Sequence, residues 1–433
     1  MSEGHVSTRE ALRSADGAQV NMRGWVYRKR DLASKVFIVL RDSEGIIQCV
    51  VDKETSPKDL LDAAERVTIE SSVEISGVVR SDPRAPGGKE VEVESLKIVG
   101  LAEDFPIKGG ESVDYLLDIR HLWLRSRRLT HIMKIRATVL DALRRYFNEN
   151  GWWEVSPPIL TQSAVEGGAT LFSVDFFGRK AYLSQSAQFY LEVMIYSLEK
   201  VWSLTPSFRA EKSRTRRHLY EFWHLEAEAA WMDMRDMMGV VEGMVKAAVK
   251  EVLDKRLEEL EALKRKLDPL EETLRSKFDE VTYDEAIEIL RRKGFNIKWG
   301  DDIGADEERA LTEDRQVPFF LTMFPKHLKS FYMKVYDPRP ELVLGFDLEA
   351  PEGYGEVVGG SQREDRYDVL YKRILEEKLN PEDYQWYLDL RRYGSVPHSG
   401  FGLGVDRLVM WIAGLDHIRD ALPFPRLRER IYP

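Results

Sequence analysis

The sequence has almost no cysteine and no long apolar segment. Cys49 is the only cysteine among 433 residues, which excludes internal disulfide bonds and any cysteine-rich zinc site. Residues 1–10 have no apolar core, and no apolar run approaches the length needed to cross a membrane. We therefore expect a cytoplasmic protein that does not associate with membranes.

An excess of positive charge is also missing. The chain carries 64 Lys and Arg residues against 74 Asp and Glu, a net charge of −10, which argues against indiscriminate binding to nucleic acids. The basic residues are unevenly distributed, because residues 119–136 contain six of them and no acid. With 43% hydrophobic and 32% charged residues, a chain of this length is expected to form two or three globular domains.

Residues 18–100 have the pattern of short strands. Three strands, a helix over about 57–66 and two further strands follow one another, separated by turn-forming residues. This order is typical of an OB-fold β-barrel, which often binds single-stranded nucleic acid. Phe37 lies beside a basic flank that includes Arg30. It is suited either to stacking on a base or to packing in the barrel core.

Glycine and proline mark the next boundaries. Residues 104–118 read as a hinge, which predicts an OB domain over 1–103 and a second domain over 119–433. A helix is expected from about 124 to 149. The paired prolines 157–158 indicate an edge strand or a subunit boundary.

Residues 232–278 carry leucines at steps of three and four, a helical pattern that Pro269 interrupts, so we expect a long helix that kinks or ends near Leu267. The spacing resembles a coiled-coil seam. We favour a helical insertion packed on the main domain over a coiled coil that binds a partner.

A basic loop between two predicted strands is the most distinctive local feature. Strands are expected at 201–204 and 222–226, and five basic residues fall within 209–217. Guanidinium groups grip phosphate oxygens bidentately, so this hairpin favours a polyanion held close to a sheet. A solvated basic hairpin is the alternative.

Carboxylates surround a glycine-rich bend further along the chain. Asp347, Glu349 and Glu356 are spaced so that they are able to converge on one hard cation, and magnesium takes oxygen ligands that it shares with phosphates. The segment 400–411 is a glycine-lined strand that leads into a helix, with Arg407 at the junction. Glycines there allow close approach of a ligand or another backbone.

Three of these segments together resemble class II aminoacyl-tRNA synthetases. Residues 151–160, the FRAE segment at 208–211 with its loop, and GLGVDR at 402–407 look like motifs 1, 2 and 3 of that class. An OB domain ahead of them resembles the aspartate, asparagine and lysine subgroup. The resemblance covers the chain from about residue 18 to its end. It implies an α+β fold: an N-terminal OB-fold β-barrel plus a class II catalytic domain, an antiparallel sheet flanked by helices.

Within the subgroup, the segments 183–192, 217–219 and 357–363 are similar to asparaginyl-tRNA synthetases of the archaeal and eukaryotic type. Aspartyl enzymes carry a lysine, which pairs with the substrate carboxylate, where this chain has Leu191, and Glu192 follows here. Without the lysine and with an added carboxylate, the pocket favours a substrate with an amide side chain, asparagine, over one with a negatively charged side chain, aspartate. The alternatives are an aspartyl enzyme that charges both tRNAs, a tRNA-independent asparagine synthetase paralogue, and a non-enzymatic RNA-binding protein.

The resemblance implies ligation of asparagine to tRNA(Asn) through an asparaginyl-adenylate, with ATP and Mg2+ as cofactors and no protein nucleophile. Arg209 and Arg407 are the implied catalytic residues: Arg209 holds the α-phosphate and the substrate carboxylate, and Arg407 holds the γ-phosphate. Motif 3 usually ends Glu-Arg, whereas this chain has Asp406. Further implied ATP contacts are Glu211, Arg217, His218, Leu219, Gly404 and Phe222, with Phe222 under the adenine.

The remaining implied sites are the metal, the amino acid, the anticodon and the dimer. Asp347 and Glu356 would bind magnesium, with Glu349 as the alternative to Asp347. Pro158 would lie at a homodimer interface near the other subunit's site. Phe37, Gln48 and Arg30 would contact the anticodon, and Lys212, Arg214 and Arg216 are available to the tRNA acceptor end. The implied amino-acid pocket consists of Glu166, Gln185, Ser186, Gln188, Glu192 and Arg363.

Overall fold

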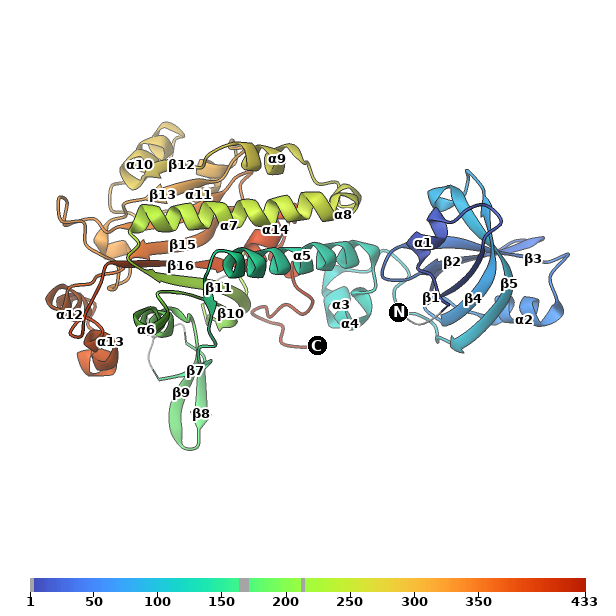
Figure 1. Ribbon diagram of the computed structural model, residues 1–433, viewed down its shortest axis with the longest axis horizontal. Coiled ribbons are helices and arrows are strands. Elements are labelled where there is room, and N and C mark those ends of the chain that lie inside the picture. The colour runs from blue at the N-terminus through green and yellow to red at the C-terminus, as the bar shows by residue number, and fades with distance from the viewer. Residues whose placement is uncertain (1–3, 163–170, 212–214) are drawn as a thin grey trace. The chain divides into compact units, whose positions relative to one another are not determined.

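The computed structural model describes residues 4–162, 171–211 and 215–433 (Figure 1). The chain divides into two compact units, Met1–Leu116 and Leu117–Pro433. In the described ranges, no helix is long and apolar enough to cross a membrane.

The first unit is a closed five-stranded barrel with the strand order β1-β2-β3-β5-β4. The predicted succession of three strands, a helix and two strands is confirmed. The barrel closes because β3 pairs with β5 in parallel, so it is not partly open as in many OB-folds. Its strands are β1 (Gln19–Asp31), β2 (Lys35–Arg41), β3 (Ile46–Asp52), β4 (Ser72–Ser81) and β5 (Lys89–Gly100), with helices α1 (Thr8–Arg13) and α2 (Lys58–Arg66) and the turn η1 (Pro86–Gly88).

Strict alternation along β2 separates the inside of the barrel from its outer face. Val36, Ile38 and Leu40 are fully buried in the barrel core. Phe37 falls between them and is only half-buried. Successive side chains of a strand point to opposite faces, so Phe37 lies on the outer face, not in the core.

The second unit is built on an eight-stranded sheet with the order β12-β13-β14-β15-β16-β11-β10-β6. The sheet is mixed, not wholly antiparallel as expected, because β6 and β12 pair in parallel with β10 and β13 at its two edges. The strands are β6 (Trp153–Glu154), β10 (Lys200–Phe208), β11 (Glu221–Ala230), β12 (Asp279–Thr282), β13 (Phe319–Thr322), β14 (Gly345–Ala350), β15 (Gly355–Gln362) and β16 (His398–Gly404).

Two long helices, α5 (Arg127–Glu149) and α7 (Met234–Lys255), pack against each other across one face of this sheet (Figure 1). The predicted helix at 124–149 is confirmed, and it begins after Ser126, whose side chain caps it. Residues 232–278 contain three helices, α7, α8 (Leu257–Ala262) and α9 (Asp268–Arg275), so the first helix ends before the predicted break near Leu267. Their apolar side chains, including Val241 and Met244 on α7, belong to the main core under the sheet.

The remaining elements surround the sheet. A small sheet of order β7-β9-β8 lies beside α6 (Figure 1). Its strands are β7 (Leu160–Thr161), β8 (Ser173–Phe176) and β9 (Arg179–Leu183). The other helices and turns are α3 (Val113–Asp118), α4 (Arg120–Trp123), α6 (Gln188–Leu198), α10 (Tyr283–Arg292), α11 (Ala305–Thr312), η3 (Lys326–Leu328), α12 (Tyr367–Glu376), η4 (Pro381–Tyr384), α13 (Gln385–Asp389), α14 (Val405–Ile412) and η5 (Ile418–Asp420).

Candidate active site

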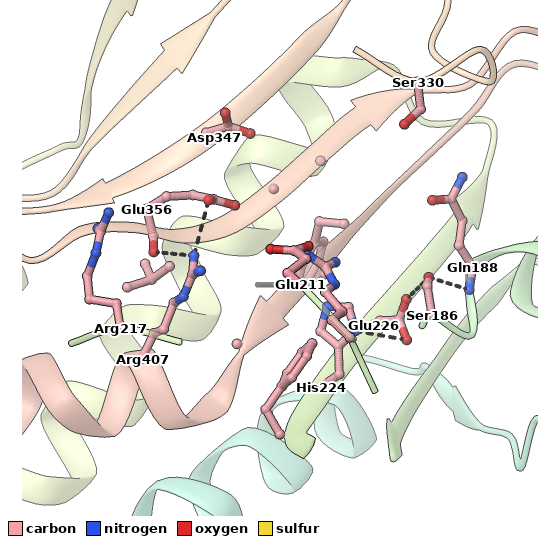
Figure 2. Close-up of a pocket in the computed structure, with 18 of the residues that line it drawn as sticks. Ser186, Gln188, Glu211, Arg217, His224, Glu226, Ser330, Asp347, Glu356 and Arg407 are labelled. Atoms are coloured by element: carbon pink, nitrogen blue, oxygen red, sulfur yellow. Dashed lines mark hydrogen bonds and ion pairs between the residues drawn. The ribbon is translucent and has the colours of Figure 1, made fainter. Parts of the chain in front are cut away.

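A cavity of about 360 Å³ lies over strands β10, β11, β15 and β16 in the second unit (Figure 2). It holds a high density of charge, because both cations and carboxylates face it. Its lining includes Ser186, Gln188, Arg209, Glu211, Arg217, His218, Leu219, Phe222, His224, Glu226, Lys329, Asp347, Glu356, Arg363, Gly404 and Arg407.

The β10–β11 hairpin and the glycine-lined strand β16 form the floor. β11 pairs with β16 over seven residues, from His224 opposite Gly404 to Ala230 opposite His398. A Cβ at Gly402 would lie 2.4 Å from Nε2 of His224, so only glycine leaves room for this imidazole across the strand. The predicted strand pair around the basic loop is therefore confirmed, and its end opens into the cavity.

Arg209 and Phe222 lie together at the end of this hairpin. The guanidinium carbon of Arg209 is 5.5 Å from the centre of the Phe222 ring, within cation–π range. Nε2 of His218 lies 3.5 Å from the Glu211 carboxylate, and His218 is the first cause that lowers the pKa of Glu211, with Arg209 and Arg407 adding to it against burial. The geometry suits an anion and a flat ring held side by side.

Arg407 enters the cavity from the first turn of α14. Its Nη1 donates to the Glu356 carboxylate and to the Glu356 carbonyl, both at 3.1 Å (Figure 2). Burial opposes ionisation of Glu356, but Arg407, Lys329 and Arg209 outweigh it and lower the pKa of Glu356 to about 2. Glu356 is therefore a carboxylate at neutral pH.

Asp347 converges with Glu356 on one small volume. A Cβ built at Gly359 would lie 3.3 Å from Oε1 of Glu356 and 3.4 Å from Oδ1 of Asp347, so both oxygens face the same point above β15. Nζ of Lys329 donates to Asp347 at 2.6 Å. Burial raises the pKa of Asp347 to about 7, although Lys329 opposes the shift.

Two convergent hard oxygens fit magnesium, which usually takes one or two carboxylates and completes its shell with waters and phosphates. Glu349 is buried two residues beyond Asp347 on β14, and its Oε2 accepts no hydrogen bond from a described residue. Burial and the nearby Glu308 raise the pKa of Glu349 well above its ordinary value. No group of three or more His, Cys, Asp and Glu side chains within the described residues has the geometry of a complete metal site.

Arg217 is held at the edge of the cavity by α11. Its guanidinium donates to Glu308 and to the Tyr354 carbonyl, both at 2.5 Å. A Cβ at Gly355 would overlap Nη1 of Arg217 at 1.9 Å, so this glycine makes the position of the guanidinium possible. Arg217 therefore reaches the cavity wall from the loop after β10, together with His218 and Leu219.

Ser186 and Gln188 form the opposite end of the cavity. The Ser186 hydroxyl donates to Glu226, which also accepts from the Ala187 amide at 2.7 Å. Arg363 lines the same end and forks onto Glu228, with an Nε–Oε1 distance of 3.1 Å. Burial opposes the charge of Arg363, yet Glu228 raises the pKa of this guanidinium.

Gln185 and Glu192 are not among the described residues that line the cavity. Both are buried behind its wall, and Glu192 is 0% exposed. Leu191, also fully buried, faces the small apolar cluster between α6 and the sheet. The Glu192 carboxylate, expected in the pocket, instead contacts Gln188 from behind at 3.0 Å.

Asp406 joins three elements beneath the site. Its carboxylate accepts from Arg136 on α5 and from the Trp223 amide on β11, the latter at 2.9 Å. Burial raises the pKa of Asp406, and Arg136 opposes the rise. The aspartate that replaces the usual glutamate therefore fastens α14 to the hairpin.

The predicted anticodon residues lie in the first unit. The β1–β2 register places Arg30 opposite Phe37, and both are on the outer face of the barrel. Gln48 on β3 donates to Glu90 at 2.7 Å. In the second unit, Pro158 is exposed between β6 and β7.

Three predicted residues, Glu166, Lys212 and Arg214, lie outside the described residues. Lys329, Glu226 and Glu308 were missed by the sequence reasoning although all three take part in the site or its support. Alternation along β11 places Glu226 on the same face as His224, and this alternation is the one feature of the sequence that could have predicted Glu226 as a site residue. Lys329 and Glu308 come from segments without a motif.

Comparison with known families matches both units. Residues 112–428 match tRNA synthetases class II (D, K and N), and residues 20–99 match the OB-fold nucleic acid binding domain. The first match covers well over half of the chain. The asparagine–tRNA ligase of Thermococcus kodakarensis is 58% identical over 421 residues, which cover 96% of this chain and 97% of that protein.

Solved structures agree with these relatives. The asparaginyl-tRNA synthetase of Pyrococcus horikoshii complexed with asparaginyl-adenylate superposes with a TM-score of 0.96 at 54% identity, covering 100% of both chains. The Entamoeba histolytica asparaginyl-tRNA synthetase in complex with asparaginyl-adenylate gives a TM-score of 0.88 at 33% identity, covering 97% of this chain and 98% of that one. The chain belongs to the asparaginyl-tRNA synthetase family, within the class II tRNA synthetases.

Proposed function

We propose that this protein ligates L-asparagine to tRNA(Asn) in two ATP-dependent half-reactions through an asparaginyl-adenylate. The observation that carries the proposal is one cavity in which arginines and an acidic pair, Asp347 and Glu356, lie next to a polar end formed by Ser186 and Gln188. Full-length relatives at 54–58% identity are named asparagine–tRNA ligases. A structural neighbour at 54% identity is complexed with asparaginyl-adenylate.

The first half-reaction brings two anions together. The asparagine carboxylate attacks the α-phosphorus of ATP in line, and pyrophosphate leaves. Arg209 offsets the charge that develops on the α-phosphate, and Arg407 holds the γ-phosphate while the adenine lies on Phe222. Positioning and charge neutralisation supply the rate enhancement, so the reaction needs no protein nucleophile. In the second half-reaction a terminal ribose hydroxyl of the tRNA takes the acyl group and AMP leaves.

We further propose that Asp347 and Glu356 hold magnesium, with Glu349 as the alternative to Asp347. A bound Mg2+ would neutralise charge on the β- and γ-phosphates. Glu356 stays ionised through Arg407 and Lys329, which keeps one hard ligand ready across the neutral pH range. Lys329 holds the Asp347 carboxylate toward the same point.

The preference for asparagine over aspartate follows from the charges at the amino-acid end. Leu191 occupies the position at which aspartyl enzymes carry a lysine, and it is fully buried in apolar surroundings. Arg363 is already paired with Glu228, so it offers less net positive charge to a substrate carboxylate. An aspartate side chain would thus gain little and lose its hydration.

We also propose that the OB unit binds the anticodon and that the enzyme works as a cytoplasmic homodimer. Phe37 and Arg30 lie side by side on the outer face of the barrel, which suits a stacked base and its phosphate. Exposed Pro158 and the 60% exposed Trp153 on the edge strand β6 suit a protein contact. The single buried thiol of Cys49 suits a reducing compartment.

Pyrophosphate exchange with asparagine and aspartate, measured side by side, tests the activity. We expect exchange with asparagine that exceeds exchange with aspartate by a factor of about 10² or more. Exchange with aspartate alone would replace this proposal by the aspartyl enzyme. Subsequent charging of tRNA transcripts separates the ligase from a tRNA-independent asparagine synthetase, which would activate the amino acid but transfer nothing to tRNA.

A further inference from the structure

Glu192 on α6 is the centre of a buried polar cluster that contacts the cavity lining at Gln188. Its carboxylate is 0% exposed. Nη2 of Arg391 donates to it at 2.8 Å, the Tyr387 hydroxyl at 2.8 Å, Nε2 of His398 at 2.9 Å and Nε2 of Gln188 at 3.0 Å. Arg391, Tyr387 and His398 lie between about 195 and 206 residues away in the chain.

Four donors fill the acceptor capacity of a carboxylate, which has about four lone-pair sites. Arg391 is the largest cause that lowers the pKa of Glu192 against its burial, followed by His398. The other charged groups around the cluster are Arg363 and Glu228, with Asp365 close to His398. Glu192 therefore has no acceptor left for a substrate, and any effect on the amino acid has to pass through a neighbour.

His398, at the start of β16, holds the Glu192 carboxylate from a third side. Its Nδ1 lies 2.8 Å from the Val396 carbonyl, and its Nε2 lies 2.9 Å from Glu192. The Arg391 guanidinium, which donates to the same carboxylate at 2.8 Å, favours the ionised form of Glu192. An ionised carboxylate only accepts hydrogen bonds, so Glu192 is an acceptor for Gln188.

An acceptor at this place determines which way the Gln188 amide faces. The amide nitrogen is the only end of the Gln188 side chain that donates, so it points to Glu192 and the oxygen points away. Figure 2 shows the Gln188 side chain at the edge of the cavity, beside Ser186. No described residue donates a hydrogen bond to this oxygen. The Gln188 backbone amide is bound to the Ser186 hydroxyl at 3.1 Å, which holds the residue from the other side.

We propose that Glu192 is a positioning residue for asparagine: it orients the Gln188 amide so that its oxygen accepts a hydrogen bond from an N–H group of the bound amino acid. This inference rests on the proposed function, because it needs an amino acid at this end of the cavity. Glu192 then affects the binding of asparagine but not of ATP. The role of Glu192 in recognition is therefore indirect. Glu192 directly follows Leu191, the position at which aspartyl enzymes carry a lysine.

A double-mutant cycle on Glu192 and Gln188 tests the coupling. The variants are Glu192→Gln, Gln188→Met and the double variant, and the readouts are KM for asparagine and KM for ATP in pyrophosphate exchange. We expect Glu192→Gln to raise KM for asparagine about tenfold to hundredfold, as for a lost hydrogen bond to a charged group. KM for ATP should stay within about twofold, and the double variant should match Gln188→Met alone.

The inference would be overturned if the two single-variant effects on KM for asparagine multiply in the double variant. It would also be overturned if KM for asparagine and KM for ATP rise equally, because Glu192 would then have a merely structural role. If Glu192→Gln does not fold, Tyr387→Phe takes its place in the cycle. It removes one donor and keeps the ring stacked on Phe189 at 4.1 Å. A wild-type enzyme that activates asparagine while the cycle is additive overturns this inference alone. A wild-type enzyme that does not activate asparagine overturns the proposed function first.

Discussion

At the residue scale, most of the cationic side chains that line the cavity are held in place by ion pairs with carboxylates. Arg407 contacts Glu356, Lys329 contacts Asp347 and Arg363 contacts Glu228. Each cation is thereby oriented at little cost in side-chain entropy when a substrate binds, because its position is already fixed. Arg209 lies against an aromatic face, the Phe222 ring, and close enough to Glu211 to lower the pKa of that carboxyl. We propose that it responds to the charge that appears on the α-phosphate during the reaction.

Replacing Arg209 tests this role. We expect Arg209→Ala to lower asparagine-dependent pyrophosphate exchange by a factor of about 10²–10³, the range for loss of one transition-state donor. Arg209→Lys should recover part of the loss because it keeps the charge but not the bidentate fork. Arg235→Ala is the matched control, since Arg235 is 73% exposed and pairs with Glu280. Normal exchange in Arg209→Ala would contradict the role.

His417 makes the stability of the second unit depend on pH. Burial lowers its pKa to about 4 from an ordinary 6.5, with Arg419 and Arg216 adding to the shift and Asp420 opposing it. Neutral His417 accepts from the Arg419 amide at 3.2 Å. Between pH 6.5 and 4 the unfolded chain binds a proton that the folded chain does not, so the free energy of unfolding falls as pH falls.

Because His417 is only half-buried, we expect its contribution to the loss of unfolding free energy between pH 7 and 4.5 to be about 1 kcal/mol. Urea unfolding at both pH values, followed by tryptophan fluorescence, measures it. His417→Gln should lose less stability on acidification than the wild type by about that amount. Equal losses in both proteins would assign the pH dependence to other groups.

At the element scale, the glycines of strand β16 leave space for side chains of the neighbouring strand β11 beneath the cavity. Gly402 leaves room for His224, whose Nδ1 lies 3.1 Å from the Ser207 hydroxyl on β10. The two strands and their neighbour thus form one floor. Phe222 is two residues before His224 on the same face, so a shift of the imidazole moves the ring that we propose to lie under the adenine.

Gly402→Ala should therefore impair catalysis while the sheet persists. We expect asparagine activation to fall by a factor of about 10², as for a misplacement of about 1 Å. Gly239→Ala on α7 is the control, because its Cβ would meet no atom within 4 Å. That control should raise stability by about 0.5–1 kcal/mol and leave activity unchanged. Full activity of Gly402→Ala would show that the floor adapts.

At the scale of the whole molecule, the two units have separate cores. The barrel core lies within β1–β5 and the helices α1 and α2, and the large core lies between the eight-stranded sheet and helices α5 and α7. The described residues that line the cavity all belong to the second unit. Activation of asparagine and recognition of tRNA are therefore expected to be separable.

A fragment of residues 117–433 tests this separation. It should keep asparagine-dependent pyrophosphate exchange within about tenfold of the full chain, because its core and cavity are complete. Charging of tRNA should fall by a factor of about 10² or more, since the proposed anticodon contacts are lost. Phe37→Ala in the full chain is the matched variant and should weaken charging without affecting exchange. Equal losses of both activities in the fragment would contradict independent units.

Local patterns in the sequence were sufficient for the elements and the family. The order of strands in the barrel, the hairpin around the basic loop and the helix before residue 150 follow from alternation, helical spacing and capping, which act over a few residues. The motifs that led to the family are contiguous segments as well. The leucine pattern also predicted a long helix that kinks or ends near Leu267, whereas α7 already ends at Lys255 and two short helices follow, with Leu260 and Leu270 in the core.

Only the tertiary structure decided which side chains meet. Glu308 reaches Arg217 across 91 residues, and His398 reaches Glu192 across 206. Such contacts depend on the register of β11, β15 and β16, which no short stretch of sequence encodes. For the same reason the carboxylate expected in the amino-acid pocket lies behind it. Sequence by itself determined the family and the kinds of residue that serve the site, and long-range strand pairing determined the position of each one.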